Sequence, residues 1–201
     1  NCPICGGIGY LRHDLPIDHP DFGKMIPCSC RVEELNQSAR KRLYSMSSLD
    51  ALKNLRFDNF EKRGHIGLGK LQADSLENAF NQAVNFAESR QGWLLFLGRY
   101  GCGKTHLSAA IANYAIEEGV STLFLTVPDL LDWLRYAYTN SEISFEERFE
   151  EIREIPLLIL DDFGTQNATA WAQEKIYQII NHRYVNQLPT VVTSNFLFND
   201  F

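Results

Sequence analysis

The sequence lacks any apolar run approaching the ~20 residues that a membrane-spanning helix needs, so no membrane association is expected. It also lacks an excess of basic charge. Its 19 Lys and Arg stand against 25 Asp and Glu, which argues against a strongly basic nucleic-acid-binding protein without excluding a local patch. No internal repeat, low-complexity tract or secretory signal is visible, although the chain starts at Asn1 rather than Met. The 201 residues, 45% of them hydrophobic, suit one α/β domain with a small appendage.

The stretch LGRYGCGKTHLS, residues 97–108, fits the phosphate-loop pattern G-x-x-x-x-G-K-[ST]. It lies between a strand-like run, Trp93–Leu97, and an amphipathic run, Leu107–Ile116, which is the context that the motif needs. A chance match in a glycine-rich turn is the alternative. We expect nucleotide contacts from Gly98, Arg99, Tyr100, Gly101, Cys102, Gly103, Lys104, Thr105 and His106.

Each residue type in this loop has a chemical reason to be there. Glycines let successive backbone N–H groups point inward at the α- and β-phosphates, and the helix that follows adds its N-terminal dipole. Lys104 is expected to reach the β- and γ-phosphates, and the Thr105 hydroxyl to ligate Mg²⁺. Cys102 is more readily explained as a space-filler than as a redox sensor. His106 is a weaker general-base candidate than the acid Asp162, described next.

Two later apolar runs, at 156–162 and 189–195, each end in polar residues. Asp161 at the end of the first would hold Mg²⁺, and Asp162 would orient and polarise the attacking water. Asn195 at the end of the second would sit beside the γ-phosphate and hold the same water. The alternatives are an acidic strand end that caps a turn, and an asparagine that ends a strand by turn chemistry.

The rhythm of the chain after residue 70 predicts alternating helices and strands, hence a doubly wound parallel sheet with helices on both faces. Ligands are then expected at the carboxyl ends of the strands. Helices are expected at Leu71–Ser89, Lys104–Glu118, 128–138, 144–155 and Thr169–Asn186, and strands at Trp93–Leu97, Ser121–Val127, 156–162 and 189–195.

Four segments together, GRYGCGKTHLSAAIAN, VPDLLDWLR, LLILDDFG and IINHRYVNQLPTVVTSN, resemble the AAA+ ATPases of the DnaC/DnaI helicase-loader group, which also includes IstB-type transposition helpers. The resemblance covers about residues 55–195 and implies an AAA+ core. In that core Gly98–Thr105 is Walker A, Asp161 and Asp162 are Walker B, and Asn195 is sensor 1. It also implies that the FDNF segment lines the adenine through Phe57 and Phe60, although loop packing alone would explain these aromatics.

The resemblance also raises an expectation about neighbouring subunits. Arg183 matches the arginine of the family's N-x-R-Y stretch and could face a second subunit in an ATP-dependent self-association; a surface or packing role is the more common account for a helical arginine. The family continues past sensor 1 to a final strand, a trans-acting arginine finger and often a lid, whereas this sequence ends at FLFNDF. We therefore expect a longer natural chain and weak ATP hydrolysis by this piece alone.

The N-terminal segment is different in character, because it holds four of the five cysteines and little periodicity. Cys2-x₂-Cys5 and Cys28-x-Cys30 bring four thiolates toward one tetrahedral centre, as in structural zinc sites, although His13 or His19 could replace one sulfur. Unmetallated thiols or a disulfide are the alternatives. DnaI-type loaders carry an N-terminal zinc module, so the resemblance agrees. We expect three parts: a zinc module at 1–31, a helix and linker at 32–66, and an ATPase core at 67–201.

The leading hypothesis is a cytoplasmic replication protein that uses ATP or ADP, Mg²⁺ and Zn²⁺ and loads the replicative helicase onto DNA. Contact with single-stranded DNA is suggested by a mildly basic stretch, 31–63, and by Trp133 and Tyr136, which lie off the apolar stripe of their helix. A surface linker and helix packing are the plainer accounts of these features. The alternatives for the whole protein are an IstB-type transposition helper, a zinc-dependent binding adaptor with a structural nucleotide and, more distantly, a small-molecule kinase.

Overall fold

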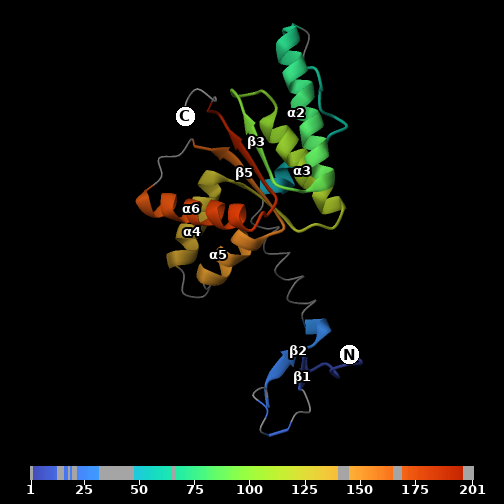
Figure 1. Cartoon of the computed structure of the whole chain (residues 1–201), viewed down its shortest axis with the longest axis vertical. Helices are drawn as coiled ribbons and strands as arrows, with labels where there is room; N and C mark the ends of the chain where they lie inside the picture. The colour runs from blue at the N-terminus through green and yellow to red at the C-terminus, as the bar shows by residue number, and fades with distance from the viewer. Residues whose placement is uncertain are drawn as a thin grey trace. The chain divides into compact units, whose positions relative to one another are not determined.

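The computed structural model of the chain describes residues 2–12, 16–17, 19, 22–31, 48–64, 67–139, 145–164 and 169–196. The chain forms two compact units, Asn1–Ser45 and Met46–Phe201 (Figure 1). The helix expected at 32–45 lies outside the described residues. Among the helices that are described, none has the length and apolar character needed to cross a bilayer.

The larger unit is built on a four-stranded parallel sheet in the order β3-β6-β5-β4, which confirms the predicted architecture. Three of the four strands are buried along nearly their whole length, as expected for a parallel sheet covered on both faces. All four carboxyl ends meet at one edge of the sheet. The strands are β3 (Trp93–Leu97), β4 (Thr122–Thr126), β5 (Leu157–Phe163) and β6 (Thr190–Ser194).

The helices cover both faces of this sheet. The connection from β3 to β4 crosses the sheet in one direction, whereas the connections from β4 to β5 and from β5 to β6 run in the other. Because such crossovers are right-handed, α3 lies on one face and α4, α5 and α6 on the other, as Figure 1 shows; α2, which precedes β3, packs against α3 on the first face. The helices are η1 (Ser48–Leu52), α2 (Lys70–Ser89), α3 (Lys104–Glu117), α4 (Val127–Thr139), α5 (Phe145–Glu154) and α6 (Ala170–Val185).

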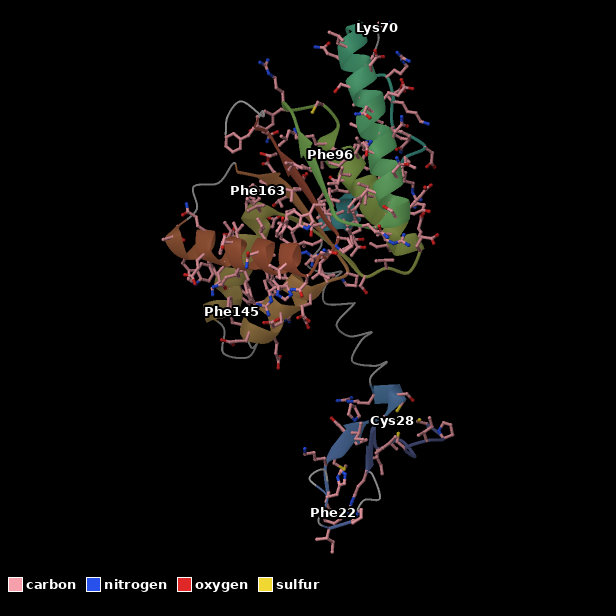
Figure 2. All side chains as sticks on the ribbon, in the orientation of Figure 1. Phe22, Cys28, Lys70, Phe96, Phe145 and Phe163 are labelled. Atoms are coloured by element: carbon pink, nitrogen blue, oxygen red, sulfur yellow. The ribbon has the colours of Figure 1, made fainter. Side chains whose placement is uncertain are left out.

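The core beside α3 joins apolar side chains from α2, α3 and the sheet, including Phe80, Phe86 and Ile111. Leu71, in the first turn of α2, is 87% exposed. Its helix begins at Lys70, at the outer end labelled in Figure 2, and its buried residues start only at Ala73. A helical stripe predicts a face but not where along the helix the packing begins.

Arg183, on α6, is fully buried, which contradicts the idea that it faces a second subunit. Its Nε donates to Thr190 Oγ1 at 2.9 Å, and its guanidinium donates to the carbonyls of Arg153, Ile155 and Pro189 at 3.0, 2.8 and 2.6 Å. Burial lowers the pKa of Arg183 to about 10, so the group stays protonated at neutral pH. This side chain therefore ties the end of α6 to the segments that enter β5 and β6.

Replacing Arg183 by methionine should destabilise the larger unit strongly. Methionine fills much of the space but leaves the Arg153 and Ile155 carbonyls without the guanidinium donor, at a cost of about 1–3 kcal/mol each, while the Pro189 carbonyl keeps the Leu158 N–H. We expect the free energy of unfolding in urea to fall by about 3 kcal/mol or more. Asn181→Ala, an exposed substitution two residues earlier on the same helix, is the control and should change it by less than about 0.5 kcal/mol. Equal stabilities of the two variants would contradict this role.

Candidate functional site

The loop between β3 and α3 requires bare backbone at two positions. At Gly103, where φ is +92°, a Cβ would lie 2.9 Å from the Phe60 ring, and at Gly98 one would lie 2.9 Å from Cys102 Sγ. Helix α3 begins directly afterwards at Lys104, and Gly103, its N-cap, offers no side chain to cap it. The first backbone N–H groups of α3 are therefore left available for an anion.

Lys104 carries a positive charge into this loop. Its Nζ donates to the carbonyls of Gly98 and Arg99 at 2.7 and 3.0 Å, and to Asn195 Oδ1 at 2.9 Å. None of the ion pairs found among the described residues includes Lys104. An ammonium without a carboxylate partner, beside an uncapped helix start, fits a phosphate group.

The ends of β5 and β6 bring the predicted polar residues to the same place. Thr105 Oγ1 donates to Asp161 Oδ2 at 3.0 Å, and Asn195 Nδ2 donates to Asp162 Oδ1. A hydroxyl and a buried carboxylate side by side are oxygen ligands of the kind that Mg²⁺ takes, so these residues fit the metal. The structure thus groups Lys104 with Thr105, Asp161, Asp162 and Asn195. The individual roles of these residues in binding and catalysis stay predictions.

His106 faces away from this group, toward the segment before α2. Its Nε2 lies 2.9 Å from the Arg56 carbonyl and 3.0 Å from Asn59 Oδ1. Asn59 Oδ1 already accepts the Arg56 N–H, and Asn59 Nδ2 donates to the Asn54 carbonyl, so both partners of His106 are acceptors. Nε2 must therefore carry the proton. His106 holds this segment against α3, and its expected contact with nucleotide stays a prediction.

Phe57 and Phe60, expected at the adenine, form an aromatic cluster on the same side of α3. Phe60 packs edge-on against His106 with ring centres 5.0 Å apart, and Phe57 packs edge-on against Phe80 at 5.7 Å. Both are half-buried. The cluster borders the phosphate loop at Gly103, which is compatible with a base-binding role.

Asn113 is a residue whose role the sequence alone does not reveal. It lies on the buried face of α3, and its Nδ2 donates to the carbonyls of Leu52 and Leu55 at 3.1 and 2.9 Å. It thereby fixes the segment that leads to Phe57. An amide in an otherwise apolar helix face is the one signal that could have identified it.

The two aromatic residues proposed to contact single-stranded DNA differ in burial. Trp133 is half-buried and lies under the Arg148 guanidinium of α5, 5.6 Å from the ring centre, so packing between helices accounts for it. Tyr136 is exposed. DNA contact by either residue stays a prediction.

In the smaller unit, two short antiparallel strands, β1 (Tyr10–Arg12) and β2 (Met25–Pro27), bring the two cysteine pairs together. The four Sγ atoms of Cys2, Cys5, Cys28 and Cys30 all lie within 4.8 Å of one another, and Cys28 is labelled in Figure 2. The closest approaches, 3.4 and 3.9 Å, exclude a disulfide and bracket the sulfur–sulfur separation of about 3.8 Å that a tetrahedral site with 2.3 Å Zn–S bonds requires. These residues fit zinc.

The pKa values of the cysteine cluster are shifted in ways that favour the binding of a cation. The Gly9 N–H, 3.3 Å from Cys5 Sγ, lowers the pKa of Cys5 to about 6. The Cys5 backbone N–H lowers the pKa of Cys2, whereas the neighbouring Cys5 side chain raises the pKa of Cys30 to about 12. The last thiol keeps its proton unless a positive charge joins the cluster. Within the described residues the cluster contains no histidine; His13 lies outside them.

Comparison with known proteins agrees with the ATP-binding motifs of the sequence. The model of a family described as IstB-like ATP binding proteins matches residues 32–201. The replicative helicase loader DnaI of Bacillus subtilis is 33% identical over 98% of this chain and 64% of its own length. The replicative helicase loader DnaC of Escherichia coli K12 is 27% identical over 83% of this chain and 66% of its own. The chain thus spans just under two thirds of these relatives.

Among solved structures, a crystal structure of the DnaC helicase loader superposes with a TM-score of 0.60 at 25% identity, covering 72% of this chain and 78% of that one. The predicted resemblance and the AAA+ fold class are thereby confirmed.

The cysteine cluster predicts one bound zinc ion per chain and a defined pH dependence. Zinc binds thiolates, so it must displace any protons that the sulfurs hold. Because the pKa of Cys5 is about 6, zinc affinity should fall more steeply with decreasing pH below 6 than above it. Metal analysis and chelator competition on either side of pH 6 measure both quantities. Cys28→Ser/Cys30→Ser should lose the metal, while Cys102→Ser keeps it; metal-free wild-type protein with four reactive N-terminal thiols would contradict the site.

Proposed function

We propose that this chain, which belongs to the family of IstB-like ATP-binding proteins, binds and slowly hydrolyses ATP and helps to load a replicative helicase onto DNA. The observation that carries the nucleotide site is the meeting of Lys104, Thr105, Asp161 and Asn195 at one end of the sheet. The similarity to the DnaI and DnaC loaders supports the helicase partner.

In this proposal Lys104 gives up its present hydrogen bonds when it binds a phosphate group. Its Nζ now donates to two loop carbonyls and to Asn195, and a phosphate would compete for the ammonium with these neutral acceptors. Thr105 and Asp161 would hold Mg²⁺, which when bound neutralises charge on the β- and γ-phosphates. The second hydrogen of Asn195 Nδ2 would donate to the γ-phosphate while the first still binds Asp162, and Oδ1, released by Lys104, would accept from the attacking water.

Asp162 is the group that would orient the attacking water and accept its proton. Its carboxylate accepts a hydrogen bond from Asn195 Nδ2, which supports a position next to the γ-phosphate. Hydrolysis by a single chain should be slow in the absence of an arginine finger from a neighbouring subunit, because such a residue contributes ~10³–10⁵ in rate. Arg183 cannot supply one, since it is fully buried and bonded to backbone carbonyls.

The cysteine module supports protein docking. Ile4, Ile8, Ile17 and Met25, all in the smaller unit Asn1–Ser45, are each more than half exposed, as the apolar residues of a protein-binding surface are. We infer that this surface binds the helicase. An IstB-type transposition helper, the first alternative, would use the same core on duplex DNA and a transposase; a binding adaptor would be indifferent to nucleotide.

The nucleotide site predicts that Lys104→Ala weakens ATP binding by about 10- to 100-fold, the value of one or two hydrogen bonds to a charged group. Binding of a fluorescent ATP analogue measures this directly. Lys70→Ala removes the same charge at the exposed start of α2 and should bind like wild type. Undiminished affinity and turnover in Lys104→Ala would remove the nucleotide assignment.

The helicase hypothesis is tested by pull-down with a replicative helicase, with and without ATP, beside ATPase assays with single-stranded DNA. A loader should bind the helicase in a nucleotide-sensitive manner, and Cys28→Ser/Cys30→Ser should abolish the contact while Lys70→Ala, at the exposed start of α2, retains it. Binding to duplex DNA and transposase instead indicates the transposition helper. Partner binding unaffected by Lys104→Ala indicates the adaptor. Absence of helicase contact under every nucleotide condition ends the loader proposal.

A further inference from the structure

The pairing of β5 with β6 is interrupted where the acids lie. Leu160 opposes Val192 and Phe163 opposes Ser194, so two residues of β5 face only one residue of β6, Thr193. This is a β-bulge, a feature that bends a strand, re-aims its side chains and occurs often beside active sites.

The Thr193 hydroxyl makes two hydrogen bonds at this bulge, one as donor and one as acceptor. It donates to Asp161 Oδ1 at 2.6 Å and accepts the Asp162 backbone N–H at 2.9 Å. Thr193 is 1% exposed, so water does not compete for either bond. One hydrogen and one lone pair of a single side chain thus hold two consecutive acidic residues.

The bulge explains how both carboxylates reach the same site. Successive residues of a regular strand point to opposite faces of the sheet, so Asp162 should point away from the loop that Asp161 faces. Asp162 instead has φ +60°, a left-handed conformation that is strained for a residue with a side chain. Its carboxylate meets Asn195, which also binds Lys104, while Asp161 meets Thr105. The bond to Thr193 replaces the ladder hydrogen bond that the bulge removes.

We propose that Thr193 is the positioning residue that separates the tasks of the two acids. By donating to Asp161 Oδ1, it leaves Oδ2 as the closer acceptor of the Thr105 hydroxyl, at 3.0 Å against 3.3 Å for Oδ1, and as the oxygen that would bind a metal. By holding the Asp162 N–H, it keeps the turned backbone that directs Asp162 to Asn195. This inference rests on the proposed nucleotide function and assigns a residue to it.

The test compares Thr193→Val, which keeps the shape and removes the hydroxyl, with Thr193→Ser, which keeps the hydroxyl. ADP affinity is measured by calorimetry with Mg²⁺ and with EDTA. We expect Thr193→Val to lose most of the Mg²⁺-dependent gain in affinity, by about tenfold, because a hydrogen bond to a carboxylate is removed. Its affinity in EDTA should stay within twofold of wild type, and Thr193→Ser should retain the gain.

The matched control is Ser194→Ala, which removes a neighbouring buried hydroxyl that donates to the Phe163 carbonyl at 2.8 Å and not to an acid. It should keep the full effect of Mg²⁺. If Thr193→Val fails to fold, Thr193→Cys, a weak donor of similar size, should show the same selective loss. A full Mg²⁺ effect in the variant that folds overturns the inference. A wild-type protein that binds no nucleotide contradicts the proposed function itself, and the inference falls with it.

Discussion

The proposed nucleotide site depends on the parallel register of β3, β6 and β5. The pair Leu97–Ser194 places the exit of β3, where the phosphate loop begins, beside the exit of β6. Lys104 and Asn195, 91 positions apart in the chain, can bond at 2.9 Å only because these strands end together. A shift by one residue would turn the strand faces over and separate the ammonium from the amide. Every later contact of the site builds on this alignment.

The two units are stabilised by different interactions. The larger one buries a continuous apolar sheet between helices and can afford Arg183 in its interior, because backbone carbonyls surround the guanidinium. The smaller one has only short strands and many exposed apolar side chains, so its order depends on the four sulfurs. The Cys5 side chain raises the pKa of Cys30 to about 12, and a bound cation would favour the thiolate there and link the four sulfurs.

The sequence predicts the sheet, its helices and the grouping of Lys104, Asp161 and Asn195, because motif spacing and parallel strands place polar strand ends together. It does not predict the bulge opposite Thr193, because a register shift leaves no periodic trace in the residues. Nor does it predict the partners of Arg183, which come from segments up to 30 residues away.

The same limit applies to the segment before α2. His106 and Asn113 contact residues 47 to 61 positions earlier, in a stretch without helical or strand periodicity that reads as a connector. Only the aromatic residues Phe57 and Phe60 hint at packing there. Side-chain hydrogen bonds between distant segments are set by the fold as a whole, so no local pattern announces them.

The central claim is that nucleotide takes Lys104 from Asn195 while Asp161 and Thr105 keep their places around a metal. A crystal structure with Mg²⁺ and a non-hydrolysable ATP analogue tests it most directly. We predict phosphate oxygens on Lys104 Nζ and on the first N–H groups of α3, with the Lys104–Asn195 bond broken and Asp162 still on Asn195. A nucleotide bound elsewhere, or a Lys104 that keeps its bonds to Gly98 and Asn195 with the analogue present, would contradict the account.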